Sequence, residues 1–329
     1  MTSQDSSDVA VLLINLGTPD APEPAAVRRY LAEFLSDPRV VEIPQAIWKP
    51  VLHGVVLRTR PAKSARAYRQ IWTNEGSPLM AITARQASAL QERLGDQLCV
   101  GFAMRYGKIS ICHALETMVD HGYRRILVAP LYPQYCAATT ASAMDAVGAC
   151  LGSMRVQPAI RTLPAYFDDP IYIDALHRNL SGQLEALDFR PERLLLSFHG
   201  MPERTRDLGD PYFHHCQVTA SALAGRLSIP VDVAFQSRFG RAKWLQPASD
   251  AVISSYPSRG TRRIAVAAPG FSADCLETLE ELGIRNRESF IAAGGSHFAL
   301  LECLNDSEEG IGMLERLVRR ELAGWWPSS

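Results

Sequence analysis

The sequence predicts an α/β protein made of two similar halves, each a four-stranded parallel sheet flanked by helices. Short apolar runs alternate with amphipathic segments along most of the chain. The runs are almost continuously hydrophobic, as strands buried on both faces of a parallel sheet are. This rhythm breaks between Arg161 and Pro170, which separates the strands into two groups of four. A single eight-stranded barrel is the competing arrangement.

The elements follow in order along the chain. Strands are expected at 9–16, 98–104, 125–131, 156–160, 193–198, 231–235 and 263–268, with an eighth around 297–303. Helices are expected at 25–35, 110–121, 140–151, 174–187, 212–227, 247–256, 273–286 and about 307–322. The predicted organisation is an N-terminal half over residues 1–163, a C-terminal half over 164–305 and a last helix within 306–329.

Composition and charge exclude several classes of protein. The 329 residues are 47% hydrophobic and carry a formal net charge of −1, which gives no basis for a nucleic-acid partner. No apolar stretch reaches the roughly 20 residues needed to span a bilayer, and residues 1–8 resemble neither a signal nor a transit peptide. The seven cysteines form no CxxC pair, which argues against a disulfide framework. We therefore expect a cytoplasmic protein.

Residues 39–62 depart from the strand–helix pattern. They are apolar but contain Pro44, Pro50 and Pro61, so one unbroken helix is not expected. One interpretation is a packed irregular loop. The other is an exposed apolar lip beside a site for a flat hydrophobic ligand. The residues alone leave both open.

His199 is the most informative single residue. Ligands of open parallel sheets bind beyond the carboxyl ends of the strands, and His199-Gly200 directly follows the expected strand 193–198. An imidazole there could accept a proton near neutral pH or ligate a metal. His214 and His215 are adjacent, so on a helix they point about 100° apart and form a poor metal-binding pair. No phosphate-loop motif occurs, which disfavours a nucleotide-binding or sugar-binding protein.

An acidic stripe is expected on the helix 273–286, which Ser272 could cap. Asp274, Glu277 and Glu281 have the spacing i, i+3, i+7 and would share one face. This pattern fits a solvated acidic face near the positive end of a helix dipole. It also fits a line of carboxylates leading to a metal or proton acceptor opposite His199.

Seven segments resemble the ferrochelatase family, in the family's order and at similar spacing, between about residues 9 and 322. They are LLINLGTP (12–19), AMRYG (103–107), LYPQY…TT (131–140), LSFHGMPERT (196–205), GDPY (209–212), FQSRFGRAKWLQP (235–247) and PGFSADCLETLEEL (269–282). The resemblance implies two Rossmann-like halves with an active-site cleft between them and a last helix that packs back on the first half. It also implies that residues 39–62 form a lip over a porphyrin held in the cleft.

The resemblance also assigns residues. His199 matches the active-site histidine and Glu277 its partner carboxylate across the cleft; both are candidate catalytic residues and iron ligands. Asp274 and Glu281 would extend the acidic line as a proton or metal relay. Cys275 stands where some relatives have histidine, so one relay residue is missing. The residues matched to porphyrin binding are Leu16, Arg60, Ser77, Arg105, Tyr106, Tyr132, Trp244 and Phe271.

The implied activity is insertion of Fe²⁺ into protoporphyrin IX to form protohaem, with release of two protons. The alternatives are a coproporphyrin III ferrochelatase, a cobalt or nickel chelatase for a related tetrapyrrole, and a non-catalytic haem or porphyrin carrier. Porphyrin and ferrous iron would be the partners, with peripheral membrane contact through the lip. We expect no tightly bound cofactor, and no iron–sulfur cluster because only a helix and a short tail follow Cys303.

Overall fold

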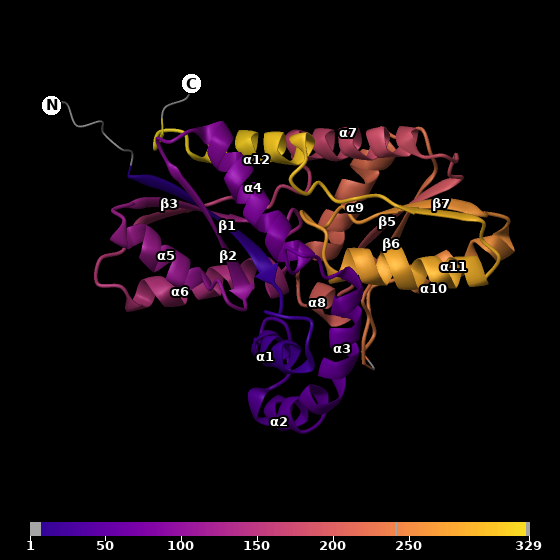
Figure 1. Ribbon diagram of the computed structural model, residues 1–329, viewed down its shortest axis with the longest axis horizontal. Helices are drawn as coiled ribbons and strands as arrows, with labels where there is room; N and C mark the ends of the chain where they lie inside the picture. The colour runs from indigo at the N-terminus through magenta and orange to yellow at the C-terminus, as the bar shows by residue number, and fades with distance from the viewer. Residues whose placement is uncertain (1–7, 241, 327–329) are drawn as a thin grey trace. The chain divides into compact units, whose positions relative to one another are not determined.

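The computed structural model describes residues 8–240 and 242–326 (Figure 1). Residues 1–7, over which no leader peptide was expected, lie outside the described residues. The chain divides into two compact units. Unit 1 comprises the residues up to Tyr132, Ala137–Pro164 and those from Ile311 onward, and unit 2 comprises Pro133–Cys136 and Ala165–Gly310.

Unit 1 contains a four-stranded parallel sheet with the strand order β2-β1-β3-β4. Its strands are β1 (Val9–Gly17), β2 (Cys99–Tyr106), β3 (Arg125–Pro130) and β4 (Ala159–Thr162). The central strand β1 is fully buried from Val9 to Ile14, as its unbroken apolar sequence predicts. The last strand begins three residues later than expected, because Val156 is exposed and precedes the ladder.

Helices flank the four-stranded sheet of unit 1. They are α1 (Pro24–Phe34), α4 (Pro78–Leu94), α5 (Ile111–Asp120) and α6 (Ser142–Ser153), the last preceded by a π-helical turn, Ala137–Ala141. The helices α5 and α6 bury Leu115 and Val147 in one core with the strands. The prediction did not include α4, whose buried face mixes apolar residues with Thr83 and Gln86 and so gives a weak hydrophobic stripe.

Residues 45–71 are helical, which excludes the irregular loop that was one of the two interpretations. The helix α2 (Gln45–Val51) runs into a π-helical segment (Leu52–Val56) and then into α3 (Leu57–Ile71). Pro50 and Pro61 both lie inside helices. The π segment, with its wider i→i+5 bonding, interrupts the α-helical pattern, so the helix is not regular throughout. We call residues 45–71 the helical arm.

Unit 2 contains a second four-stranded parallel sheet with the order β6-β5-β7-β8, the same arrangement as in unit 1. Its strands are β5 (Arg193–His199), β6 (Val231–Gln236), β7 (Arg263–Ala267) and β8 (His297–Leu300). Its helices are α7 (Pro170–Ala186), α8 (Glu203–Asp207), α9 (Tyr212–Ala224), α10 (Ser249–Ser255) and α11 (Arg287–Ala292), with a short 3₁₀ turn (Pro257–Arg259) and a π-helix (Glu277–Asn286). Two open sheets exclude the single barrel and confirm the predicted fold class.

The last helix, α12 (Glu308–Glu321), and the residues after it contact unit 1. Arg93 on α4 forms an ion pair with Glu315 at 3.3 Å. Beyond the helix, the guanidinium of Arg161 lies 4.2 Å from the ring centre of Trp325. Unit 1 therefore combines residues from the beginning and the end of the described chain. Among the described residues, no helix is both long enough and apolar enough to cross a membrane.

A disulfide joins Cys112 on α5 to Cys150 on α6, 38 residues later. The scattered cysteines gave no reason to expect it, so the prediction of no disulfide is wrong for this pair. The cause is tertiary: the two helices are neighbours in the same core, which brings the Cα atoms within 5.2 Å. The other five cysteines, all among the described residues, form no disulfide.

Candidate active site at the carboxyl edge of the second sheet

His199 ends strand β5, where the sequence placed it. Its side chain is partly exposed, and Nδ1 lies 2.7 Å from the carbonyl oxygen of Gly200. A carbonyl can only accept a hydrogen bond, so Nδ1 carries the proton and Nε2 keeps its lone pair. Gly200 is required because an added Cβ would lie 2.5 Å from the carbonyl oxygen of Gln236. The imidazole therefore presents a basic nitrogen at the carboxyl edge of the sheet.

Gln236 connects His199 to the acidic segment. The two residues are paired in register across β5 and β6, and Gly200 N donates to Gln236 O at 2.7 Å. The buried Gln236 side chain donates from Nε2 to the main-chain carbonyl of Glu277 at 2.8 Å. Its Oε1 accepts from Ser197 at 2.7 Å. One buried amide thus holds the start of the acidic helix against the strand that carries His199, a role that the sequence analysis missed.

Glu277 is the first residue of the π-helix and is partly exposed. The neighbouring Cys275 is buried, and burial, followed by the charge of Glu277, raises the pKa of its thiol well above the ordinary value. The thiol therefore stays protonated and interacts with the Glu277 carboxylate as a hydrogen-bond donor. π-Helical segments occur frequently at functional sites.

Asp274 does not share a helical face with Glu277, which corrects the predicted acidic stripe. The helix begins only after Asp274, so the i, i+3 spacing does not apply. Asp274 is buried, and its oxygens accept from Thr278 Oγ1 at 2.7 Å and Asn305 Nδ2 at 2.7 Å. It also accepts from the main-chain N–H of Cys303 at 3.2 Å. These bonds fix the turn before the helix, which is a structural role.

Glu281 does lie on the π-helix, one turn beyond Glu277. Its two oxygens accept from Ser237 N at 2.8 Å and from Ser237 Oγ at 2.5 Å, and Arg285 lies 3.7 Å away. Ser237 has a φ of 66°, a conformation uncommon for a residue other than glycine. Glu281 lines a cavity of about 140 Å³ with Phe235, Gln236, Ser237, Arg238, Asp250, Arg285 and Asn286. A relay role for Glu281 therefore remains a proposal, whereas its bonds to Ser237 are observed.

Aromatic side chains lie near His199 and Gly200 within unit 2. The Phe271 ring centre lies 6.4 Å from that of His199. Trp244 is buried, its ring centre lies 5.0 Å from that of Phe239 at a tilt of 53°, and its Nε1 donates to the Phe239 carbonyl at 2.9 Å. Tyr212 is a residue to which the sequence analysis gave no role. Burial raises the pKa of its hydroxyl well above the ordinary value, and that hydroxyl forms a hydrogen bond with the main chain of His199.

Arg105 and Tyr106 are bonded to Asp37, a partner that the sequence did not suggest. The buried Asp37 accepts from Arg105 Nη2 at 2.6 Å and from Tyr106 Oη at 2.8 Å. Ser142 completes the network by donating to Asp37 at 2.6 Å. Tyr106 is only 1% exposed, so it acts within the core of unit 1. Arg105 also donates hydrogen bonds to Asp37 and Ser142. These partners were not expected for a residue predicted to contact a propionate.

The remaining candidates on unit 1 lie at different depths. Ser77 precedes α4, is buried, and accepts a hydrogen bond from Thr18 Oγ1 at 2.8 Å. Leu16 near the end of β1 and Tyr132 after β3 are partly exposed. Arg60 lies on α3, where burial lowers the pKa of its guanidinium from the ordinary value. Their roles toward a porphyrin stay predictions.

His214 and His215 do not form a metal pair. The ring of His215 stacks on Phe167 at 3.6 Å, and its Nδ1 accepts from the main-chain N–H of Tyr135 at 3.2 Å. Burial, followed by the neighbouring His214, lowers the pKa of His215. This histidine is a packing residue.

The edge of unit 2 thus offers a partly exposed imidazole and a partly exposed carboxylate, on two main-chain segments that Gln236 joins. Imidazole suits iron as a ligand and carboxylate suits hard divalent cations, and either group can accept a proton. Two positions predicted from the sequence, His199 and Glu277, therefore lie on segments that the fold joins. The arrangement is suited to metal and proton chemistry.

Comparison with known proteins identifies the family of this chain. The ferrochelatase family model matches residues 8–322. The chain is 53% identical to the ferrochelatase of Methylibium petroleiphilum over 322 residues, covering 96% of this chain and 88% of that relative. It is 50% identical to the ferrochelatase of Rhizobium meliloti, covering 96% of each.

A solved structure shares the fold at low sequence identity. SirB from Bacillus subtilis, determined with Fe³⁺, aligns with a TM-score of 0.59 at 12% identity and covers 96% of each chain. That likeness supports the two-sheet architecture alone, whereas the family model and the close relatives cover nearly the whole sequence. The chain belongs to the ferrochelatase family.

Proposed function

We propose that this protein inserts ferrous iron into protoporphyrin IX, forming protohaem and releasing two protons. The observation that carries the proposal is the attachment of His199 and Glu277 to one buried residue, Gln236, at the carboxyl edge of the second sheet. Membership of the ferrochelatase family, with porphyrin and ferrous iron as substrates, supports the choice of reaction.

Metal insertion replaces two pyrrole N–H protons by one Fe²⁺ ion, so the site has to accept protons and handle a cation. His199 Nε2 is the available lone pair on the imidazole, because Nδ1 donates to Gly200. Glu277 supplies an anionic oxygen for the incoming ion or for a proton. Protons then leave outward past Glu281. The two principal residues together meet the requirements of the reaction.

Iron insertion also requires the porphyrin ring to bend, and the aromatic residues are suited to hold a bent ring. A planar porphyrin presents its nitrogen lone pairs poorly to an approaching ion. A rigid wall that binds a bent ring better than a flat one lowers the barrier by differential binding. Trp244 is held by its hydrogen bond and its ring contact to Phe239, and Phe271 lies beside His199. These rings are the proposed rigid wall.

An anaerobic turnover assay tests the proposal. The protein is mixed with Fe²⁺ and protoporphyrin IX, and the haem spectrum is followed over time. Many turnovers per protein are expected. A stoichiometric spectral change without turnover would indicate a porphyrin or haem carrier instead. Parallel assays with coproporphyrin III, and with Co²⁺ or Ni²⁺ in place of iron, decide the substrate, and faster turnover with any of them would overturn the specific proposal.

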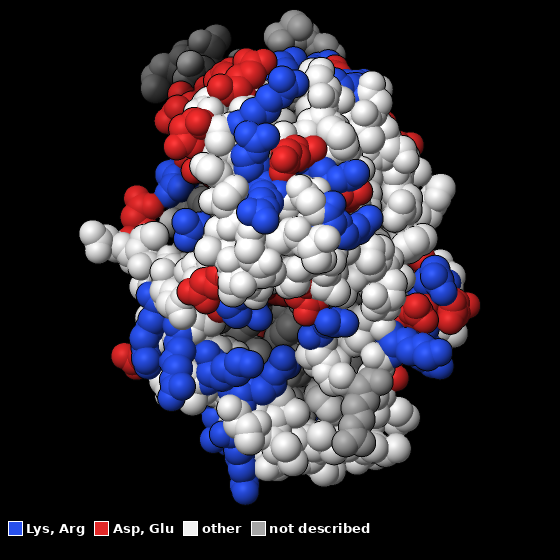
Figure 2. Space-filling model, turned by 90° about the vertical axis from the view of Figure 1, so that its right-hand side faces the viewer, with Lys and Arg blue, Asp and Glu red and all other residues white. Residues whose placement is uncertain are grey.

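We also propose that the helical arm contacts a membrane surface. Ile47, Val51 and Val55 follow one another at intervals of four residues and are 64%, 43% and 58% exposed. The arm carries six cations, Lys49, Arg58, Arg60, Lys63, Arg66 and Arg69, and neither Asp nor Glu. Figure 2 shows Lys and Arg side chains gathered in one region of the face that it presents. Apolar residues beside cations are typical of a surface that binds anionic lipid.

Sedimentation with lipid vesicles tests the membrane contact. Wild-type protein should bind vesicles that contain phosphatidylglycerol more strongly than vesicles of phosphatidylcholine alone, and salt should weaken the binding. Combined Ile47→Ser, Val51→Ser and Val55→Ser changes should release it. Val156→Ser with Leu208→Ser is the matched control, because these apolar residues are 62% and 61% exposed elsewhere. Equal binding by both variants would contradict the proposal.

A further inference from the structure

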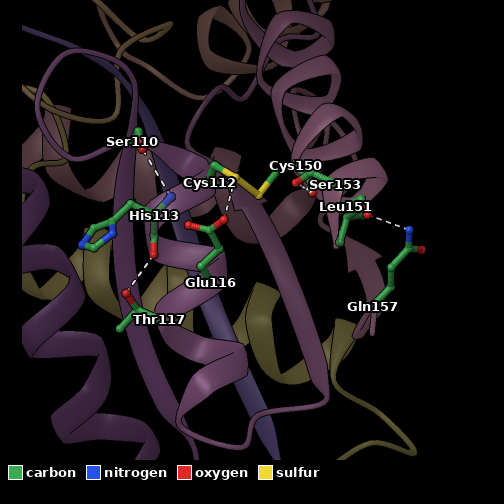
Figure 3. The surroundings of a disulfide bond; sticks show 9 residues. All are labelled: Ser110, Cys112, His113, Glu116, Thr117, Cys150, Leu151, Ser153 and Gln157. Atoms are coloured by element: carbon green, nitrogen blue, oxygen red, sulfur yellow. Dashed lines mark hydrogen bonds between the residues drawn. A yellow bond between two sulfur atoms is a disulfide. The ribbon is translucent and has the colours of Figure 1, made fainter. Parts of the chain in front are cut away.

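The sulfur pair Cys112–Cys150 lies in unit 1, outside the machinery described above (Figure 3). Cys112 is the second residue of α5 and is partly exposed, whereas Cys150 is buried near the end of α6. Ser110 caps α5 by accepting a hydrogen bond from His113 N at 3.2 Å. The accessible sulfur of the pair is therefore that of Cys112, in the first turn of α5.

A carboxylate stands beside the two sulfurs. Glu116 follows Cys112 by one helical turn, and its Oε1 lies 3.7 Å from Cys112 Sγ (Figure 3). The two sulfurs and a Glu116 oxygen all lie within 4.8 Å of one another. A disulfide sulfur has no proton to donate. In the oxidised state the Glu116 carboxylate therefore receives no hydrogen bond from Cys112. Three potential ligand atoms thus converge on one point that solvent reaches through Glu116 and Cys112.

We propose that Cys112, Cys150 and Glu116 form a binding site for a thiophilic divalent cation such as Zn²⁺ when the sulfurs are reduced, and that the disulfide is the oxidised, metal-free state of the same site. A dithiol reductant opens the disulfide: it transfers two electrons and two protons and becomes a disulfide itself. The cation then displaces the two thiol protons and binds both thiolates and the carboxylate. Oxidation reverses the sequence and releases the ion.

The ligand set favours this class of cation. Thiolates are soft donors that select zinc and similar ions over magnesium and calcium. Three protein ligands leave a fourth tetrahedral position for water, which the partly exposed edge of the cluster permits. The backbone already holds the cysteines with Cα atoms 5.2 Å apart, so both sulfurs can reach one ion without movement of the helices. The site is chemically distinct from the imidazole and carboxylate of unit 2.

Cobalt is the probe for the experiment, because thiolate-to-Co²⁺ charge transfer absorbs in the near ultraviolet and reports sulfur ligands alone. The titration uses the full chain carrying His199→Ala and Glu277→Gln, so that metal uptake by those residues does not contribute. Reduced protein should bind one Co²⁺ with a charge-transfer band, Zn²⁺ should abolish the band, and oxidised protein should show none. Circular dichroism checks that each variant is folded.

Single substitutions assign the ligands. Cys112→Ser and Cys150→Ser should each remove the band. Glu116→Gln should weaken Co²⁺ binding by about tenfold or more, since even residues that only orient a metal ligand cost 10–100-fold. The exposed position of Glu116 makes a folding defect in this variant easy to exclude. Cys99→Ser is the matched control, because Cys99 is a partly exposed cysteine outside the cluster.

Three outcomes would overturn the proposal. The first is reduced protein that shows no charge-transfer band. The second is a band that survives Cys112→Ser, which would place the sulfur ligands elsewhere. The third is unchanged affinity in Glu116→Gln, which would remove the carboxylate from the site.

Discussion

The two units use the same strand arrangement but finish their carboxyl edges differently. In unit 1, Gly17 at the end of β1 lies so close to β2 that an added Cβ would be 1.9 Å from the carbonyl oxygen of Tyr106. In unit 2, Gly200 follows β5 and approaches the carbonyl oxygen of Gln236 on β6 in the same way. A glycine thus allows the first strand of each unit to approach its edge neighbour.

Beyond these glycines the two edges diverge. In unit 1 a buried carboxylate, Asp37, accepts hydrogen bonds from Arg105, Tyr106 and Ser142. In unit 2 the imidazole and the carboxylate are partly exposed, and the buried connecting residue is the neutral Gln236. The same strand arrangement therefore stabilises unit 1, where the charged groups at the sheet edge pair with one another. In unit 2 a neutral residue holds the segments that carry the charged groups, and these groups stay accessible to a substrate.

The largest expected effect is on catalysis in unit 2. His199→Ala and Glu277→Gln should each lower the rate of iron insertion by about 10²–10⁴-fold, the usual contribution of a positioned acid or base. Porphyrin binding, followed by fluorescence quenching, should persist because neither change removes an aromatic wall. Glu288→Gln, an exposed carboxylate on the adjacent helix α11, should leave the rate unchanged. A fully active His199→Ala protein would refute the assignment of the site.

The next effect is on the stability of unit 1. Asp37→Asn leaves Arg105 with a neutral partner in a buried network, and breaking a buried ion pair costs about 3–5 kcal/mol. The free energy of unfolding in urea should fall by about that amount. Asp20→Asn removes a pair with Arg29 whose side chains are 45% and 66% exposed, and should change stability by less than about 1 kcal/mol. Equal losses would show that the Asp37 network contributes no more than a surface pair.

The same network predicts how stability depends on pH. Burial alone would raise the pKa of Asp37, but hydrogen bonds from Ser142, the Arg39 main chain and Tyr106, with the charge of Arg105, hold it below the ordinary value. A lowered folded-state pKa gives stability that is complete above the unfolded value, about 3.9, and is lost as pH falls through the folded value.

Urea unfolding at a series of pH values checks this sign. The stability difference between wild type and Asp37→Asn should be constant above about pH 5 and should shrink below about pH 4. A difference that grows on acidification would mean that Asp37 is protonated in the folded protein at neutral pH.

The smallest effects distinguish the two glycines. Gly17→Ala meets both a backbone contact and a φ of 114°, so it should destabilise the protein by about 1–3 kcal/mol or more, the usual cost of overpacking. Gly200→Ala meets the Gln236 carbonyl and, at 3.3 Å, the Trp244 ring, but has no positive φ; it should cost less stability and reduce activity, because His199 precedes it. Gly182→Ala, where a Cβ meets nothing within 4 Å, is the control for thermal unfolding and turnover. The opposite ranking of the first two would break the comparison.

The strands and their grouping could be predicted because a strand buried on both faces has to be apolar, as β1 and β5 are. The helical arm could not, because prolines at positions 50 and 61 argue against a helix and a π segment has no sequence pattern of its own. Asp274 was wrongly predicted to share a helical face with Glu277, because the helix was assumed to be an α-helix that begins at residue 273. The π-helix begins at Glu277.

For the candidate site, the position of His199 at the end of β5 could be predicted from the apolar run before it, and Glu277 from the motif that follows β7, whereas their roles stay predictions. Gln236 and Asp37 could not be predicted, since their partners lie 41 and 68 or more residues away in the chain, and only tertiary structure brings them together. The pairing of Cys112 with Cys150 has the same cause. Long-range polar contacts carry no local periodicity, so they appear only once the fold is known.

The late return of the chain to unit 1 has a consequence for biosynthesis. Unit 2 has all of its residues once position 310 has left the ribosome, whereas unit 1 still lacks α12 and the partners of Arg93 and Arg161. Domains generally fold as units during translation. The earlier-translated strands of unit 1 therefore wait for residues beyond 310, and in a released chain truncated after residue 310 unit 2 should resist protease more than unit 1.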